Sequence, residues 1–299
     1  MKLLASVAIL GVLTAAALPA SAYCRTSIDD KFVQTAAKPC DDKLKVSWAT
    51  RCMGFSVQTN ASKQLDLASA QKLAEGAFAE WHAHDCQECG AGAMGKPSLA
   101  SQDVGPVACD QVEFNQGKDR GNANVVIFRD GAWPHSGVAL ALTTITYRVD
   151  TGEIYDGDIE VQSNPTEIKL AVGDTVNPGE YDLRSILTHE AGHFYGLAHS
   201  TDPTATMFAS YRAGQSFMRD LSKDDVCGIC DVYPPNRAAA CDSAPRGGLV
   251  SECGGDKGCG CSVPGGDASR AGAGLSVFAL LLGLARRKGA RACAPGRAP

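Results

Sequence analysis

The sequence has no excess of positive charge. Its 28 Lys and Arg residues are outnumbered by 33 Asp and Glu residues, and the formal net charge is −5. Because binding to a phosphate backbone depends on clustered Lys and Arg, this balance argues against a nucleic-acid partner. The sequence also lacks internal repeats, a phosphate-binding loop and a dinucleotide-binding motif, which argues against repeat proteins and nucleotide-binding enzymes.

Histidine is scarce, with 6 residues in a chain of 299. Half of them, His189, His193 and His199, fall in the stretch 189–199, HEAGHFYGLAH. Since an α-helix turns about 100° per residue, His189 and His193 lie on one helical face. Gly196 can adopt the left-handed conformation that ends a helix, so that His199 can approach the other two rings. The spacing predicts a metal site with three histidine ligands.

The chemistry of these residue types indicates one catalytic Zn²⁺. Neutral imidazoles suit zinc, and three protein ligands leave a fourth position for water. Zinc lowers the pKa of such a water to about 7, and a neighbouring carboxylate can accept its proton. Glu190 follows the first ligand directly and is the predicted general base. The alternatives are ordinary core or surface histidines and a structural zinc site.

The motif and its continuation, HSTDPTATMFASY, resemble the metzincin metallopeptidases, and within them the matrixin-like branch. In that branch Ser, Asp, Met and Tyr follow the third ligand at fixed spacing, and Ser200, Asp202, Met207 and Tyr211 occupy those places here. The resemblance implies that Met207 forms the Met-turn, a hydrophobic floor beneath the zinc. It also implies that Tyr211 helps to shape the substrate pocket.

Periodicity and turn signals predict helices and strands in the order of that family. The expected fold is α+β, with a twisted mixed sheet, two long helices and a small C-terminal subdomain that ends in a helix. Helices are expected at 67–83, 182–195 and 221–235, and strands at 123–130, 137–148 and 153–162. The first turn of the middle helix is expected to be capped by Asp182, and that of the last by Ser222 and Asp225.

Two further roles follow from the resemblance. It makes the strand at 137–148 the edge against which an extended peptide lies, although an ordinary edge strand is the alternative. It also implies that Asp224 or Asp225 pairs with the amino terminus of a matured enzyme, whereas a solvated helix start is the other interpretation.

Metal sites beyond the catalytic zinc have fewer candidate ligands. Only His82, His84 and His135 remain for the second, structural zinc of vertebrate matrixins, so a single zinc is expected. Calcium often accompanies the family, and the loops around Asp150, Asp156 and Asp158 offer oxygen ligands, although such turns are commonly just polar. The family's cysteine-switch motif is missing; its nearest equivalent is KPCDD around Cys40.

The ends of the chain read as targeting segments. Residues 1–22 have the pattern of a secretory signal peptide, so that the mature chain begins at Tyr23. We expect an N-terminal extension at 23–42, the catalytic domain at 43–235, a linker at 236–257 and a sorting or anchor segment at 258–299. That last segment resembles the myxobacterial C-terminal sorting tag, with a cysteine at 259 or 261, an apolar helix at 271–285 and a basic cluster. A retained membrane anchor is the alternative.

Export places the cysteines in an oxidising compartment, where they pair. Eight of the 13 cysteines lie within or next to the catalytic region, and the sequence does not choose among their possible pairings. The motifs CQEC and CGIC could instead hold a second zinc. The eight are Cys24, Cys40, Cys52, Cys86, Cys89, Cys109, Cys227 and Cys230.

Together these features predict a secreted or surface-directed zinc endopeptidase that is monomeric and lies either outside the cell or on the cell surface (outer membrane) of a bacterium. Its partners would be a protein or peptide substrate, a sorting or processing peptidase, and a membrane in contact with the C-terminal segment. Two alternatives remain: an inactive surface binding or adhesion protein on the same scaffold, and a zinc hydrolase of non-peptide amides.

Overall fold

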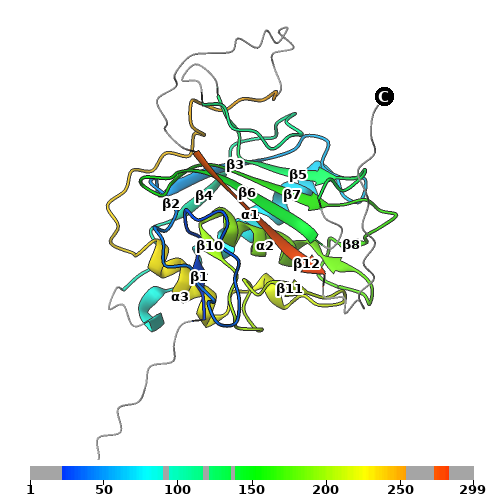
Figure 1. Ribbon diagram of the computed structural model, residues 1–299. Coiled ribbons are helices and arrows are strands. Elements are labelled where there is room, and N and C mark those ends of the chain that lie inside the picture. Colours follow the sequence, from blue (N-terminus) through cyan, green and yellow to red (C-terminus); the bar gives the residue numbers. More distant parts are fainter. Residues whose placement is uncertain (1–21, 90–93, 117–120, 136–138, 254–272, 283–299) are drawn as a thin grey trace, which may run out of the picture.

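The computed structural model describes residues 22–89, 94–116, 121–135, 139–253 and 273–282. Its main element is a sheet with the strand order β11-β12-β6-β7-β5-β3-β4, in which β2 also pairs with β7 (Figure 1). The strands are β2 Ser47–Trp48, β3 Cys52–Val57, β4 Ala100–Asp103, β5 Val125–Arg129, β6 Ala139–Arg148, β7 Glu153–Gln162, β11 Ser210–Tyr211 and β12 Ala273–Leu282.

The sheet is mixed. Strands β4, β3, β5 and β7 run parallel to one another, whereas β6 is antiparallel to both β7 and β12. The hairpin of β6 and β7 turns at residues 149–152, where Gly152 has a φ of 72°. With its helices and this mixed sheet, the chain has the predicted α+β, metzincin-like fold.

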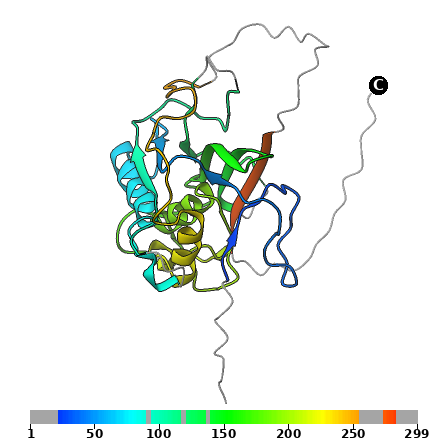
Figure 2. The same ribbon diagram turned by 90° about the vertical axis from the view of Figure 1, so that its left-hand side faces the viewer.

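Three α-helices complete the fold: α1 Leu67–Glu80, α2 Leu183–Phe194 and α3 Lys223–Val232. Short 3₁₀ turns lie at Cys86–Cys89 and Phe217–Arg219, and short strand pairs join β1 Cys24–Arg25 to β10 Leu197–Ala198 and β8 Leu170–Ala171 to β9 Tyr181–Asp182. The three helices and three strands expected between residues 67 and 235 are confirmed, with ends that differ by a few residues. In Figure 2, α1 in light blue and β12 in red lie on opposite sides of the view.

Helices α1 and α2 pack together in one hydrophobic core with the sheet. Phe78 of α1 stacks on Phe55 of β3 with ring centroids 4.2 Å apart, and meets Phe194 of α2 edge to face. Trp81, fully buried, donates from its indole nitrogen to the carbonyl oxygen of Thr188 at 2.8 Å. The core therefore fixes α2 from behind, on the side away from its histidines.

Five disulfides cross-link the described residues. They join Cys24 to Cys40, Cys52 to Cys241, Cys86 to Cys230, Cys89 to Cys227 and Cys109 to Cys253. The CQEC and CGIC motifs thus pair with each other as two disulfides rather than holding a zinc ion. Two of the bridges join α3 to the 3₁₀ turn at Cys86–Cys89, and the bridge between Cys24 and Cys40 closes a loop within the N-terminal segment.

The set of eight paired cysteines inferred from the sequence was incomplete. Cys52 and Cys109 pair with Cys241 and Cys253, which lie in the segment predicted to be a linker. Leu249 of that segment also pairs with Asn122 in an isolated, parallel β-bridge. Cysteines far apart in sequence are brought together only by the fold, so spacing alone could not identify these partners.

The apolar helix expected at 271–285 was wrong for residues 273–282, which form strand β12. A short apolar run has no periodicity that separates a helix from a buried strand, and here pairing with β6 and β11 decides. The rest of that segment and residues 1–21 lie outside the described residues. Among the described residues, no helix combines the length and apolar character that crossing a bilayer requires.

Candidate metal centre

Helix α2 carries the first two candidate ligands. Its N-cap, Asp182, accepts a hydrogen bond of 3.0 Å from the amide of Ser185, and Arg219 pairs with the same carboxylate at 2.6 Å. His189 and His193, one turn apart, are both fully buried. The helix therefore fixes the relative position of two imidazoles before any metal binds.

Gly196 ends α2 and redirects the chain toward the site. Its φ is +94°, as the sequence predicted, and a Cβ there would lie 2.8 Å from the carbonyl oxygen of Val46. Only glycine fits both the left-handed conformation and this close approach. The chain then runs through β10 to His199, which faces the two helical histidines.

The three imidazoles converge through their Nε2 atoms. Nε2 of His193 lies 3.1 Å from Nε2 of His189 and 3.2 Å from Nε2 of His199. Four ligands at about 2.0–2.1 Å from a tetrahedral zinc are separated by roughly 3.3 Å, so these spacings fit that ion. Among the described residues, this is the one group of three or more His, Cys, Asp or Glu side chains gathered closely enough to hold a metal.

Backbone carbonyls set the tautomers of the two buried rings. Nδ1 of His189 lies 2.6 Å from the carbonyl oxygen of Thr206, and Nδ1 of His193 lies 2.8 Å from that of Leu197. Since a carbonyl only accepts, each Nδ1 carries the proton and each Nε2 presents its lone pair. Both rings are thus oriented as metal ligands.

Burial also keeps the three histidines uncharged. It lowers the pKa of His189, to which His199 also contributes, to about 3, and it lowers the pKa of His199 to about 4. Burial, followed by the neighbouring His189 and His199, lowers the pKa of His193 well below its usual value. Neutral imidazole is the form that binds a metal, so the site is prepared for a cation at neutral pH.

Glu190 is held by a residue that sequence reasoning missed. The hydroxyl of Thr143, on β6, donates to Oε2 of Glu190 at 2.5 Å, and both residues are fully buried. The same hydroxyl lies 3.2 Å from the backbone oxygen of Glu190. The two residues are 47 positions apart, so no local pattern in the sequence could have paired them.

Met207 packs against α2 at Gly192, and its amide is held by Asp225. A Cβ added at Gly192 would lie 2.3 Å from the sulfur of Met207, which shows how closely α2 approaches that side chain. The carboxylate of Asp225 accepts from the amides of Thr206 and Met207 at 2.7 and 3.0 Å. Asp225, also part of the predicted capping box of α3, thus connects that helix to the turn that supports His189.

Asp224, the neighbour of Asp225, contacts the start of the described chain. Its Oδ1 accepts from the amides of Ala22 and Tyr23 at 2.8 and 2.9 Å, and its Oδ2 accepts from the hydroxyl of Ser200 at 2.7 Å. Ser200 follows the third histidine directly. Of the two candidates that the sequence left open, Asp224 is the one beside the N-terminal segment.

Tyr211 lies on β11, and its side chain is buried. Its hydroxyl donates to the carbonyl oxygen of Gln215, and its ring lies near those of Tyr181 and Phe217. Burial raises its pKa to about 12, so the phenol stays protonated. Asp202 caps a turn through the amide of Thr204 at 2.8 Å.

Of the three acidic residues considered for calcium, two come together. Asp156 and Asp158 on β7 are buried, whereas Asp150 is exposed and pairs with Arg148 at 2.5 Å. Oδ1 and Oδ2 of Asp158 accept from the amides of Val125 and Glu113, and Oδ1 of Asp156 has no hydrogen-bond partner among the described residues. Burial, followed by neighbouring carboxylates, raises the pKa of Asp156 well above its usual value.

The remaining histidines do not form a second cluster. His82 lies 3.1 Å from the hydroxyl of Ser101, and His84 and His135 each pair with one glutamate at 2.7 Å, Glu80 and Glu160 respectively.

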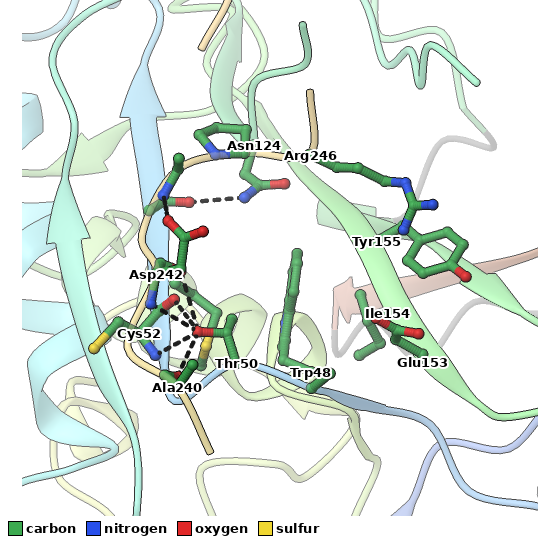
Figure 3. Close-up of a pocket in the computed structure, with 15 residues that line it drawn as sticks. Trp48, Thr50, Cys52, Asn124, Glu153, Ile154, Tyr155, Ala240, Asp242 and Arg246 are labelled. Atoms are coloured by element: carbon green, nitrogen blue, oxygen red, sulfur yellow. Dashed lines mark hydrogen bonds between the residues drawn. The ribbon is translucent and has the colours of Figure 1, made fainter. Parts of the chain in front are cut away.

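Two of the pockets in the described part of the chain differ in their distance from the three histidines. The first, of about 310 Å³, is lined by β2, β3, β7 and residues 240–246 and includes none of the three histidines (Figure 3). Arg246 stacks on Tyr155 at its rim, at 3.9 Å from the ring centroid. The second, of about 280 Å³, is lined by His199 and by the N-terminal segment, including Asp29, Asp30 and Phe32. It is the second pocket that lies beside the metal centre.

Comparison with known proteins identifies a family for this region. Residues 107–234 match the family model of matrixin. Human matrix metalloproteinase-20 is 35% identical over 94 residues, 31% of this chain and 18% of the relative. Metalloendoproteinase 1-MMP of Arabidopsis thaliana is 44% identical over 62 residues, 21% of this chain and 17% of the relative. Bovine interstitial collagenase is 45% identical over 65 residues, 21% of this chain and 13% of the relative. The chain thus spans less than a fifth of the length of these curated relatives.

Proposed function

We propose that this chain, in which residues 107–234 form a matrixin-like metzincin domain, is a zinc endopeptidase that hydrolyses peptide bonds. Matrixins are a family of zinc metalloendopeptidases, and the relatives found here include a collagenase. The observation that carries the proposal is the convergence of three Nε2 atoms from one helix and its following turn, with Glu190 next to the first of these histidines on the helix.

In this mechanism His189, His193 and His199 hold the metal, and Glu190 is the general base. Bound Zn²⁺ supplies a water of lowered pKa and polarises the substrate carbonyl. Glu190, fixed by Thr143, accepts the proton of the attacking water and then delivers it to the leaving amine nitrogen. Burial of the two helical histidines excludes bulk water from this side of the site.

Met207 and Tyr211 would support the site rather than react. Met207 packs against α2 at Gly192 and would keep the helical histidines in position. Tyr211, on β11, would form part of the wall of the substrate pocket.

We also propose one calcium ion at the buried pair Asp156 and Asp158. Among the described residues Oδ1 of Asp156 has no hydrogen-bond partner, and burial raises the pKa values of both carboxyls; a bound cation would supply a partner for that oxygen and balance the two charges. Asp150 belongs to a separate surface ion pair and is not part of this site.

The location we propose is outside the cytoplasm, at the cell surface. Five disulfides support an oxidising compartment, and the pattern of residues 1–22 supports export. Maturation at Tyr23 would place a free amino group beside Asp224. Sorting through residues 258–299 by a processing peptidase, contact of that segment with a membrane, and a monomeric state belong to the same proposal.

The test is to compare the purified chain with its Glu190→Ala variant. We expect both to bind about one zinc per chain, and the variant to cleave casein roughly 10²–10⁴-fold more slowly. Glu75→Ala, an exposed glutamate on α1, is the matched control and should behave like the parent. A Glu190→Ala protein that keeps its zinc and cleaves casein at the parental rate would overturn the role of Glu190.

Cleavage of a quenched peptide library distinguishes the alternatives. Loss of cleavage with a chelator and recovery with added zinc supports the endopeptidase. A chain that binds zinc but, with or without its C-terminal segment, cleaves no peptide would instead be a binding protein on this scaffold. Cleavage restricted to non-peptide amides would indicate a zinc hydrolase that does not act on peptides.

A further inference from the structure

Strand β6 pairs with β7 along one edge, and its other edge is covered by β12, a segment from the C-terminal part of the chain. Strand β12 pairs antiparallel with β6 along nearly all of its length, from Ala273 opposite Arg148 to Leu281 opposite Ala139. Figure 1 shows β12 as a red arrow alongside β6. Residues 149–272 separate the two strands in the sequence, so the pairing is a long-range docking contact and not a hairpin.

This covered edge is the one that borders the metal centre. Phe278 of β12 is paired in register with Thr143, whose hydroxyl holds Glu190. On its other side β12 runs parallel to β11, with Leu281 and Leu282 opposite Ser210 and Tyr211. It also contacts α2, the helix that carries Glu190. The backbone of β12 therefore lies between β6 and β11 and against α2.

The geometry points to an interaction surface that takes the chain's own residues 273–282: we propose that β12 occupies the substrate-binding groove in cis and blocks it. The inference rests on the proposed function, because a groove is blocked only if peptides bind there. A peptide that is cleaved beside Glu190 must lie extended along the same edge of β6 and use the same backbone hydrogen bonds. Two strands cannot share one edge.

The composition of the segment supports this competition. Residues 273–282, AGLSVFALLL, contain no charged residue and no proline, so every residue has an amide available for ladder hydrogen bonds. The same features describe the partner that the groove accepts, an extended, uncharged and mostly apolar peptide. Tethering places the segment at an effective concentration of about a millimolar, enough to outcompete a dilute substrate even if its affinity is modest.

Covering the groove in this way would also keep the enzyme latent, the role that the missing cysteine-switch motif has in the family. The chain would be latent while residues 273–282 remain attached, and cleavage anywhere before Ala273 would turn an intramolecular contact into one lost by dilution. Proteolytic removal of residues 273–282 would then itself activate the enzyme.

The experiment inserts a site for a sequence-specific protease after Gly255, downstream of the last described disulfide at Cys253. The full chain is folded first, then cut, and peptide cleavage and amide hydrogen exchange of β6 are measured before and after gel filtration. We expect about a tenfold or greater rise in cleavage rate and loss of protection at 139–146 once the fragment is removed. Co-elution of the fragment with the body also supports the docking.

Proline variants in the uncut chain provide a second measurement. Along a strand the backbone amides point alternately to one neighbouring strand and to the other. Ser276→Pro and Ala279→Pro each remove one amide, one at an even and one at an odd position, so the double variant loses at least one hydrogen bond to β6. Ala268→Pro together with Ala290→Pro, outside the paired register, is the matched control. The first pair should raise the rate and expose β6, and the second should do neither.

The exchange measurement separates this inference from the proposed function. If the amides of β6 lose protection from hydrogen exchange after the fragment is removed, but neither the uncut nor the cut chain cleaves a peptide, the docking of β12 is supported and the proposed endopeptidase activity is wrong. If the uncut chain and the body freed of the fragment cleave equally and protect β6 equally, the endopeptidase stands and the docking is wrong. A synthetic peptide of residues 273–282 that fails to inhibit the active cut form would also contradict the block.

Discussion

The hydroxyl of Thr143 and the carboxylate of Glu190, 2.5 Å apart, connect strand β6 of the sheet to the helix that carries the candidate metal ligands. The contact fixes the direction in which the carboxylate points, and it does so from the strand against which a substrate would lie in the proposed mechanism. Thr143 would thereby act on the proposed chemistry through Glu190.

Thr143→Val should therefore lower kcat with little change in KM or zinc content. Valine preserves the shape of threonine but removes the hydroxyl, so Glu190 loses the group that orients it. We expect a loss of about 10–100-fold in kcat, smaller than for removal of the base itself. Thr143→Ser, which keeps the hydroxyl, should recover most of the activity. Equal kcat values for the valine variant and the parent would show that the contact is not used.

Asp224 should stabilise a chain that begins at Tyr23 more than one with extra N-terminal residues. A free amino group at Tyr23 would lie 2.9 Å from the Asp224 carboxylate, where the longer chain places only a neutral amide. Because Asp224 is partly exposed, we expect a difference of about 1 kcal/mol in the free energy of unfolding, shrinking above pH 8 as the amino group loses its charge.

Urea denaturation of four proteins tests this coupling: both chain lengths, each with Asp224 or with Asp224→Asn. The advantage of the shorter chain should vanish in the asparagine pair. An advantage of the same size in both pairs would assign it to the removed residues instead.

Asp156→Asn should have opposite effects on stability with and without calcium. The pKa of Asp156 is raised in the folded state, so without a cation the stability it contributes is lost as pH rises through that value. At pH 7.5 in a calcium chelator the neutral asparagine should therefore stabilise the fold, by about 1–3 kcal/mol. In millimolar calcium the same change should destabilise it, because a ligand is gone.

Asp150→Asn is the matched control, since Asp150 is exposed and pairs with Arg148. Its effect should be small and the same in both conditions. If the effect of Asp156→Asn has one sign whether or not calcium is present, the pair is not a calcium site.

The metal-free protein should lose stability below about pH 6.5. The pKa values of His189 and His199 are lowered to about 3 and about 4, so between those values and about 6.5 the unfolded state binds more protons than the folded state. Stability should then rise with pH across this window and level off above it. At pH 5 each of these histidines would cost about 2 kcal/mol.

Denaturation in a chelator between pH 4.5 and 7.5 measures this slope. The His189→Asn and His199→Asn double variant should show a shallower slope, because two of the titrating groups are gone. An unchanged slope would place the acid sensitivity elsewhere.

Local patterns in the sequence predicted much of the metal centre. The spacing of His189 and His193 follows from helical geometry, and the turn at Gly196 from the absence of a Cβ. Strand β7 has the predicted bounds because its ends are marked by turn residues. These features depend on a few consecutive residues, whose conformational preferences act within one element.

The remaining features depend on contacts between distant segments. Thr143 became visible as a partner of Glu190 only once the register of β6 was known. The partners of Cys52 and Cys109 lie 189 and 144 residues further along the chain. Residues 273–282 satisfy helix and strand patterns alike, and their neighbours in space decide between the two.

The disulfides also constrain the order of events during synthesis. Only the bridge between Cys24 and Cys40 joins near neighbours, 16 residues apart, whereas the other four span at least 138. As the polypeptide emerges, Cys52 must wait until Cys241 has left the ribosome before it can form its native cross-link. Early oxidation would trap mismatched thiol pairs, so production of this protein should depend on an isomerase or a redox shuffling buffer.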